Sequence, residues 1–469
     1  PAGALRAAAR IASTKQVDAV AQEALGLTVG PFTAMNLTGG NPITNVGLDN
    51  YHSRIHSWYR SPETLAKAVD SGARWDTPSR GEKVEVPESV GKTVGEALQG
   101  AFFGICSEIV ESGISNVDDM DMAVEIALDM RAPFRFMNRI GTAEALRLVR
   151  EYAGSNPGFP VPSVLEERGE KNEPFAIRHI GRRDENGVAV LTIRRPRVLN
   201  ALNQDIFDEL REHFAAIRSD QKVEAVVLTG FGVKAFVSGA DVKFLARIES
   251  PEQGEATARD SQDALNRIED LGKPVVCAYN GLAFGGGNEL AMACHARIAL
   301  SNLRVLAAQP EVNLGIIPGA GGTQRLPRLI GFEKAAELLR SGRPISPQEA
   351  LECGLVSELV DGTIVDLRNR AVALARDLAE GRASVTPIPS EAMSPVPDSL
   401  PALELGHLSR AVDAIVVAAI LEGARLPLKE GIALEARKFG EVCGLKDMRI
   451  GVENFIANGP RAKAAFVHS

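Results

Sequence analysis

The chain has 469 residues, of which 45% are hydrophobic, and its formal net charge is −8. At roughly 150 residues per domain, this length predicts an ordinary globular protein of about three domains. The 60 acidic and 52 basic residues are spread along the chain without a basic stripe. Composition therefore disfavours nucleic acid and anionic membrane surfaces as partners.

Cysteine content and hydropathy indicate the cellular compartment and whether the chain crosses a membrane. The five cysteines are scattered and include no CxxC pair, which argues against a disulfide framework or a zinc knuckle and favours a reducing cytoplasm. The most apolar run near the C-terminus, "AIVVAAIL" at 414–421, is far shorter than the roughly 20 residues that span a bilayer. The N-terminus lacks the layout of a signal peptide. We therefore expect a cytoplasmic protein without a membrane segment.

The first part of the chain contains an internal repeat. "VDAVAQEALGLTVGPFTAM" at 17–35 returns in diverged form as "VDDMDMAVEIALDMRAPFRFM" at 117–137. Each copy has apolar positions at helical spacing that run into a Pro-Phe turn, and proline is favourable in a first helical turn. Residues 153–175 are rich in proline, glycine and charge, which is typical of a domain boundary. We predict an all-helical duplicated domain over 1–172, with copies at about 1–85 and 86–172, followed by a second domain over 173–469.

Two histidines in this part could suggest a metal pair. His52 and His56, in "NYHSRIHSWYR", are four residues apart and can share a helix face. No third ligand lies nearby in the sequence, so we favour packing or surface roles and predict no metal site.

Beyond residue 173 short β-branched runs alternate with helices. Strands are expected at 188–193, 225–230, 274–279 and 296–301. A helix that buries Ile206, Leu210, Phe214 and Ile217 separates the first two, as a crossover between parallel strands would. Five prolines in 384–402 predict a surface loop, and helical spacing resumes at Ile432, Ala436, Phe439 and Cys443. The expected fold class is α/β.

Two glycine-containing stretches are candidates for an oxyanion site. Glycines 285–287 follow an expected strand and open a helix, so their amides can face an anion; the alternative is a close-packed turn. In "KAFVSGADVKFL" at 234–245, the amide of Ser238 is a second candidate donor. Asp241 in the same stretch can serve as a helix cap, with or without a role in catalysis.

Glu289 and Glu311 are candidates for acid and base chemistry. An isolated glutamate is usually a solvated or dipole-complementing residue. Both of these glutamates lie among small and apolar residues, where burial raises a carboxyl pKa toward the range useful at neutral pH. Paired carboxylates beside an oxyanion site point to acid and base work on a carbonyl compound.

These motifs resemble the enoyl-CoA hydratase (crotonase) family. The resemblance is carried by "KAFVSGADVKFL", "KPVVCAYNGLAFGGGNELAMACHARIAL" and "QPEVNLGIIPGAGGTQRLPRLIG", in family order and spacing, and covers about 176–469. It implies a spiral of ββα turns, a homo-oligomer built from trimers, and an acyl-CoA thioester as substrate. It implies no metal and no redox cofactor, coenzyme A being part of the substrate.

The resemblance also implies residue roles. The amides of Ser238 and Gly286 would hold the thioester oxygen, Glu289 would activate water for attack at C3, and Glu311 would supply the proton at C2. The implied reaction is reversible hydration of a trans-2-enoyl-CoA. The implied contacts to substrate and CoA are Arg197, Leu199, Ala201, Gly239, Ala240 and Asp241. Arg197 would lie near phosphate, unless it is an ordinary surface arginine.

The helical part resembles the C-terminal domain of 3-hydroxyacyl-CoA dehydrogenases, present twice, as in fused bifunctional proteins of β-oxidation. "VGPFTAMNLTG" carries the resemblance best, and "RAPFRFMNRIG" has drifted from it. No dinucleotide-binding unit with GxGxxG stands before it, so we expect no NAD-dependent dehydrogenation by this chain. Either the chain is a fragment of a larger fusion or its lineage lost the NAD domain. A dehydrogenase NAD domain and a thiolase are candidate partners.

Two other functions remain open from sequence. Δ3,Δ2-Enoyl-CoA isomerisation uses the same enolate-stabilising site, and a non-catalytic assembly subunit would use the helical repeat as a docking surface. The presence of both Glu289 and Glu311 favours hydration over isomerisation and over a non-catalytic role.

Overall fold

The computed structural model describes residues 1–469 as two compact units, Pro1–Arg178 (unit 1) and His179–Ser469 (unit 2), each with its own hydrophobic core. The boundary expected at 172/173 falls within unit 1, directly after helix α10 (Ser163–Lys171).

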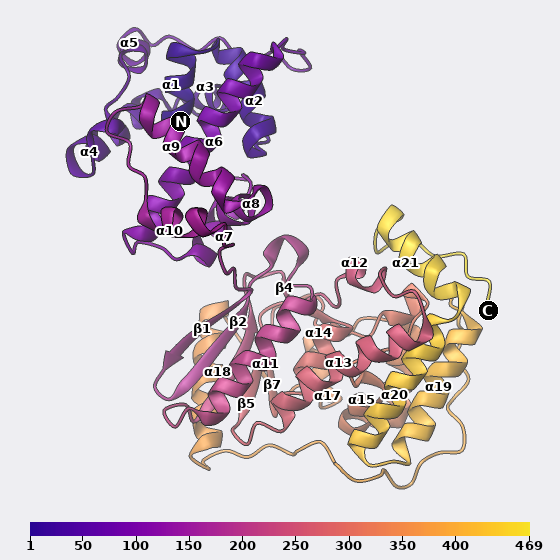
Figure 1. Ribbon diagram of the computed structural model, residues 1–469. Helices are drawn as coiled ribbons and strands as arrows, with labels where there is room; N and C mark the ends of the chain where they lie inside the picture. The colour runs from indigo at the N-terminus through magenta and orange to yellow at the C-terminus, as the bar shows by residue number, and fades with distance from the viewer. The chain divides into compact units, whose positions relative to one another are not determined.

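Unit 1 is built of helices alone (Figure 1). They are α1 (Ala2–Arg10), α2 (Thr14–Leu25), α3 (Pro31–Thr38), α4 (Asn41–Arg54), the 3-10 turn η1 (Ser57–Tyr59), α5 (Glu63–Ser71), α6 (Glu88–Glu111), α7 (Val117–Ala127), α8 (Pro133–Ile140), α9 (Thr142–Ser155) and α10. The sequence repeat corresponds to the pairs α2–α3 and α7–α8. His56 of the histidine pair lies 2.9 Å from Glu108 Oε1 of α6, at ion-pair distance.

The two helix pairs share one capping arrangement. In the first, Phe32 N and Thr33 N donate to the two carboxylate oxygens of Asp18, at 2.7 and 2.8 Å. In the second, Phe134 N and Arg135 N donate to Asp121 in the same way, at 2.6 and 3.1 Å. Both aspartates are buried. Because the proline that opens each second helix has no N–H, the next two amides are those that a buried carboxylate can satisfy.

Unit 2 contains two sheets. The strands are β1 (Ile180–Glu185), β2 (Val188–Ile193), β3 (Ala225–Gly230), β4 (Ala235–Val237), β5 (Val275–Tyr279), β6 (Leu282–Phe284), β7 (Ala296–Leu300), β8 (Ala307–Ala308) and β9 (Glu358–Val360). The larger sheet has the order β1-β2-β3-β5-β7-β9, antiparallel at β1–β2 and parallel elsewhere, and the smaller parallel sheet has the order β4-β6-β8. Successive strands alternate between the sheets from β3 to β8, so the chain advances as a spiral. The four strands expected from sequence are confirmed, two of them shortened by one residue.

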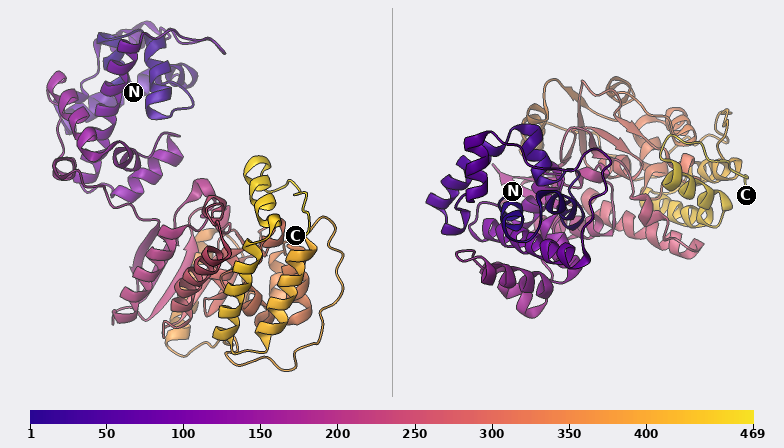
Figure 2. Two further views of the ribbon diagram at one scale, coloured as in Figure 1. Left: turned by 45° about the vertical axis from the view of Figure 1, so that its right-hand side comes forward. Right: turned by 90° about the horizontal axis from the view of Figure 1, so that it is seen from above.

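Helices cover both faces of the larger sheet. The helices of unit 2 are η2 (Pro196–Val198), α11 (Gln204–Ser219), α12 (Val242–Leu245), α13 (Pro251–Glu269), α14 (Gly286–Met292), η3 (Glu311–Leu314), α15 (Gly322–Ile330), α16 (Phe332–Ser341), α17 (Pro347–Glu352), α18 (Ile364–Ala379), α19 (Arg410–Ala424), α20 (Leu428–Cys443) and α21 (Lys446–Asn458). Alternate residues of β2 divide between the faces: Val188 and Val190 pack in the cluster with α18, whereas Leu191 and Ile193 join the main core. Helices α19 and α20 lie side by side (Figures 1 and 2). The 384–402 segment has neither helix nor strand, as expected.

Two further features bear on the sequence predictions. No helix combines the length and the apolar character that crossing a bilayer requires. No group of three or more His, Cys, Asp or Glu side chains is arranged to hold a metal ion.

Candidate active site

The glycine triplet forms the junction between β6 and α14. Gly285 has φ +51° and ψ −125°, a backbone conformation that side chains rarely allow, and its N–H donates to Ala308 O of β8 at 2.9 Å. Gly287 packs so closely on Val237 that a Cβ could not fit. Gly286 between them is the first residue of α14, and its N–H has no acceptor within the chain. The triplet thus presents one free amide at the positive end of a helix.

The second free amide belongs to Ala240, which corrects the expectation for Ser238. The N–H of Ser238 donates to Leu199 O at 3.0 Å and so is already used. Residue 240 forms a parallel bridge with Leu202, and this turns the Ala240 N–H away from that neighbouring segment. A Cβ placed on Gly286 would lie 3.7 Å from Ala240 N. The free amides of Gly286 and Ala240 therefore belong to backbone segments that approach each other closely.

Glu289 lies one helical turn into α14 and is 2% exposed. Its Oε1 accepts hydrogen bonds from Ala320 N at 2.8 Å and Gly322 N at 2.7 Å. Its Oε2 would lie 4.0 Å from a Cβ on Gly286. Burial raises the pKa of Glu289 well above its ordinary value, the charges of Glu435 and Glu311 raise it further, and the two amide bonds oppose the rise. One oxygen of this carboxylate is thus held in place while the other is directed toward Gly286.

Glu311 opens the η3 turn after β8 and is 8% exposed. Its Oε2 is buried and has no hydrogen-bond partner in the chain. Burial raises the pKa of Glu311 to about 8, with a contribution from the charge of Glu435. A buried carboxyl group of this kind keeps its proton at neutral pH and can serve as an acid.

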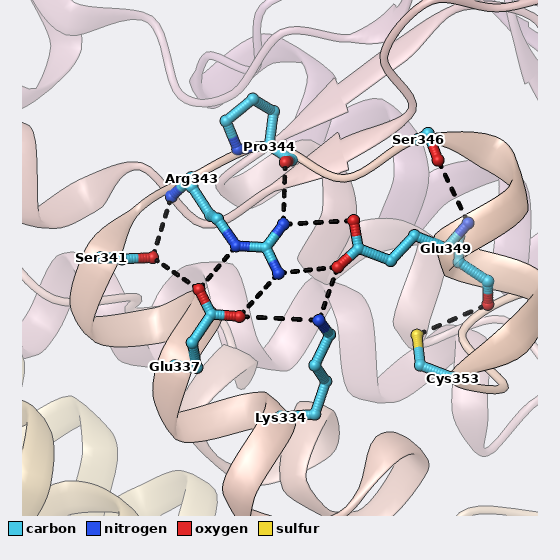
Figure 3. A network of polar contacts seen from close by, with 9 residues as sticks. Lys334, Glu337, Ser341, Arg343, Pro344, Ser346, Glu349 and Cys353 are labelled. Carbon is cyan, nitrogen blue, oxygen red and sulfur yellow. Dashed lines mark hydrogen bonds and ion pairs between the residues drawn. The ribbon is translucent and has the colours of Figure 1, made fainter. Parts of the chain in front are cut away.

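An ion-pair network centred on Arg343 (Figure 3) lies next to the segment that carries Glu311. Arg343 donates to both oxygens of Glu337 at 2.6 and 2.7 Å and to both oxygens of Glu349 at 2.6 and 3.1 Å. The next residue but one, Ile345, exchanges backbone hydrogen bonds with β8. Gly342 packs against Pro310, the residue before Glu311. The network therefore fixes the loop on which β8 and η3 rest.

Sequence reasoning missed a chain of buried amides beneath the site. Tyr279 Oη donates to Asn288 Oδ1, and Asn288 Nδ2 donates to Gln309 Oε1, both at 2.9 Å. These bonds tie β5, α14 and the segment before Glu311 together. The placement of Asn288 next to Glu289 was a usable signal, because a buried asparagine in a short helix needs partners.

The residues expected to contact CoA lie on two adjoining segments, 197–201 and 239–241. Leu202 N donates to Gly239 O and Asp241 N donates to Leu202 O, at 2.8 and 2.7 Å. Arg197 and Leu199 are exposed, whereas Ala201 and Gly239 are buried. The carboxylate of Asp241 caps α12 through Lys243 N and pairs with Arg195 at 3.3 Å, so its oxygens are engaged within the protein.

A buried asparagine, also missed from sequence, holds the first of these segments. Asn200 is 1% exposed, and its Nδ2 donates to Ala235 O and Phe236 O at 3.0 and 3.1 Å, while its Oδ1 accepts from Arg195 N at 2.9 Å. Leu199 and Asn200 both have positive φ. The side chain of Asn200 therefore holds the 197–201 loop in a defined conformation.

Together these groups are suited to chemistry on a polarised carbonyl compound. Two free amides can bind an oxygen that gains negative charge, and two buried carboxyl groups lie beside them with raised pKa values. All four groups belong to unit 2.

Comparison with known proteins agrees with this chemistry. Residues 183–405 match the family model described as enoyl-CoA hydratase/isomerase. A crotonyl-CoA hydratase from Syntrophomonas wolfei is 36% identical over 293 residues, which cover 62% of this chain and 99% of that protein. A short-chain-enoyl-CoA hydratase from Clostridium acetobutylicum is 36% identical over 272 residues, or 58% of this chain and 92% of that protein.

A larger relative matches only in part. The fatty acid oxidation complex subunit alpha from Shewanella frigidimarina is 36% identical over 211 residues, which cover 45% of this chain but 29% of that subunit. Among solved structures, a carnitinyl-CoA dehydratase from Mycobacterium thermoresistibile superposes with a TM-score of 0.51 at 23% identity, covering 62% of this chain and 93% of that one. This similarity shows the fold of unit 2.

Proposed function

Because the chain belongs to the enoyl-CoA hydratase/isomerase family, we propose that unit 2 catalyses the reversible hydration of a trans-2-enoyl-CoA to a 3-hydroxyacyl-CoA. The observation that carries the proposal is the placement of two buried carboxyl groups, Glu289 and Glu311, beside the free amides of Gly286 and Ala240. Two hydratases support the proposal, because each aligns with this chain over nearly its full length.

In the proposed mechanism the two amides bind the thioester oxygen. Their hydrogen bonds strengthen as this oxygen becomes an enolate, and each such donor is typically worth about 3 kcal/mol in the transition state. Ala240 takes the role that the sequence resemblance assigned to Ser238, because the Ser238 amide is bonded to Leu199 O.

The two carboxyl groups divide the elements of water between C3 and C2. Glu289 takes a proton from water through Oε2 while the water oxygen bonds to C3, and the π electrons of the C2–C3 bond move to the thioester oxygen. The enolate then collapses and C2 takes the proton of Glu311, and the proton that Glu289 took from water passes to Glu311 to restore both groups. The amide bonds to Glu289 Oε1 stabilise its ionised form and so oppose the rise in pKa that burial causes, whereas burial raises the pKa of Glu311 to about 8 and keeps its proton in place at neutral pH.

Substrate binding is assigned to the loops beside Ala240. We assign the CoA moiety to the segments at 197–201 and 239–241, with Arg197 close to phosphate. Asp241 acts there through its cap on α12 and its pair with Arg195, which hold the two segments together. No step requires a metal or a redox cofactor.

For unit 1 we propose descent from the helical domain of 3-hydroxyacyl-CoA dehydrogenases. The duplicated helix pairs with their aspartate caps support a repeated unit, and the alpha subunit of a fatty acid oxidation complex is a relative of unit 2. We place the hydration in β-oxidation and expect a trimer-based homo-oligomer, with a dehydrogenase NAD domain or a thiolase as further partners. Light scattering after size exclusion tests the oligomer.

A hydration assay over acyl chain lengths, run with and without NAD, tests the proposal. We expect crotonyl-CoA turnover and no NADH formation. Product analysis with 3-enoyl-CoA distinguishes Δ3,Δ2-isomerisation, in which the double bond moves without uptake of water. Absence of turnover on every enoyl-CoA would favour a non-catalytic assembly subunit instead.

A further inference from the structure

A four-residue turn before α15 holds two carboxylates at once. The amides of Ala320 and Gly322 donate to Glu289 Oε1, as described above. The other two amides of the turn donate to a different carboxylate, that of Glu435 in α20. Gly321 N donates to Oε1 at 2.5 Å, and Thr323 N donates to Oε2 at 2.7 Å. Gly321 has φ +105°, which lets successive N–H groups point in opposite directions. The turn 320–323 is therefore clamped between Glu289 and Glu435.

Glu435 is fully buried and saturated with donors. Thr323 Oγ1 adds a bond to Oε2 at 2.6 Å, and Gln262 Nε2 of α13 lies 3.4 Å from Oε1. Gln262 also donates to Gly319 O and Ile432 O, at 3.1 and 2.8 Å. These contacts join α13, α20 and the turn into one polar cluster directly behind Glu289.

We propose that Glu435 is a positioning residue for the hydration reaction: it fixes the turn that holds Glu289 and imposes its negative charge on the catalytic pair. This inference rests on the proposed hydratase function. Glu435 does not reach the reacting atoms, because all its oxygens are used within the protein.

The hydrogen bonds of Glu435 account for its structural role, and its charge adds a second effect. An apolar side chain at 435 would match its neighbours on α20, but it would leave the amides of Gly321 and Thr323 buried without acceptors. A carboxylate satisfies both and also acts at a distance. Its charge is among the causes that raise the pKa of Glu289 and of Glu311.

The titratable and charged groups that face Glu435 come from several elements. They are Glu289 of α14, Glu311 of η3 and Arg325 of α15, which in turn pairs with Glu269 of α13 at 3.3 Å. Burial raises the pKa of Glu435 to about 6, while the bonds from Thr323 and Gly321 and the charge of Arg325 oppose the rise. Above this value Glu435 is ionised and its charge acts on both catalytic groups.

The test compares kcat and KM for crotonyl-CoA across pH in the full chain. The variants are Glu435→Gln and, as a matched control on the same helix, Glu441→Gln, whose exposed carboxylate pairs only with Lys438. We expect Glu435→Gln to lower kcat by about 10²-fold, the effect of a catalytic group displaced by about 1 Å, with little change in KM. Both limbs of the pH profile should move to lower pH, because loss of a neighbouring negative charge lowers the pKa values of Glu289 and Glu311. Glu441→Gln should match the wild type.

Two results would overturn the inference. One is a wild-type kcat in Glu435→Gln; the other is a kcat lowered equally at every pH with both limbs unmoved, which a merely structural role predicts. Should Glu435→Gln fail to fold, Thr323→Val removes one donor and keeps the carboxylate. The Thr323 bond lowers the pKa of Glu435, so its loss raises that pKa and leaves less negative charge beside Glu289 at low pH. The variant must then lower kcat and move the acidic limb to lower pH, as Glu435→Gln does; an unchanged profile counts against the inference. A wild-type chain without hydratase activity would instead contradict the proposed function.

Discussion

The carboxylate of Glu311 lies directly over the backbone of Gly285. A Cβ at position 285 would be 2.6 Å from Glu311 Oε1, closer than any real contact. Gly286, the next residue, differs: a Cβ there would meet Leu202 at 3.4 Å, an ordinary distance, and would point toward Ala240 N at 3.7 Å. The two adjacent glycines therefore have different roles. The absence of a side chain at Gly285 leaves room for the Glu311 carboxyl group, and its absence at Gly286 leaves the proposed oxygen-binding site open.

This contrast predicts different consequences for alanine at each position. Gly285→Ala should lower both stability and turnover, because it combines a strained positive φ with displacement of Glu311. Gly286→Ala should lower turnover with little effect on stability, because its methyl group would occupy the oxygen site. Thermal melts beside crotonyl-CoA assays separate the two. A Gly286→Ala enzyme with normal turnover and a lower melting temperature would support a turn without an oxyanion role.

The raised pKa of Glu311 predicts a stability cost at high pH. An unfolded chain releases this proton from its ordinary value of 4.5 upward, whereas the folded protein keeps it to about 8. Unfolding therefore releases a proton in this window, and the free energy of unfolding falls as pH rises through it. Glu311→Gln removes the effect, so its melting temperature relative to wild type should increase between about pH 5 and about pH 9. A difference that stays constant over that range would refute the assignment.

Glu349 predicts the opposite pH dependence. Hydrogen bonds from Arg343 are the main reason that the pKa of Glu349 is lowered from 4.5 to about 2 (Figure 3). The stabilisation is complete above the ordinary value and is lost as pH falls toward about 2. Arg343→Met should therefore destabilise unit 2 at neutral pH and less so in acid. Arg382→Met, at an exposed residue of the turn that follows α18, is the control and should have little effect; equal losses in both variants would contradict the prediction.

The paired caps of unit 1 predict equivalent losses from two distant substitutions. Asp18→Ala and Asp121→Ala each leave two helix-opening amides without acceptors, which costs about 1–3 kcal/mol of stability. Exposed Glu23→Ala on α2 is the control and should be neutral. Chemical denaturation of unit 1 measures the losses, and crotonyl-CoA turnover should be unchanged. If either aspartate variant is as stable as Glu23→Ala, the aspartate cap does not stabilise both copies of the repeat.

Much of the fold could be predicted from sequence, because its signals are local. Buried parallel strands are runs of β-branched residues, so β2 and β3 were expected at their observed bounds. The glycine triplet before Glu289 identified the strand-to-helix junction. These features depend on neighbours within a few residues.

The rest depended on contacts between distant segments. Ser238 and Ala240 are equivalent by composition, and only the pairing of 199–202 with 238–241 decides which amide is free. Glu435 did carry a signal, since it lies on the same helix face as Ile432, Ala436 and Phe439, where a charged residue is unexpected. Its partners in the 320–323 turn could not be identified without the structure.

The central claim is that Glu289 and Glu311 act as one acid–base pair, and the most direct measurement is crotonyl-CoA hydration by Glu289→Gln, Glu311→Gln and the double variant. We predict that each single substitution lowers kcat by about 10²-fold to 10⁴-fold, the loss expected for a positioned acid or base. The double variant should lose far less than the product of the two, because groups that act as a unit are not additive. All three variants should melt as folded proteins. Near-wild-type turnover by either single variant would contradict the account.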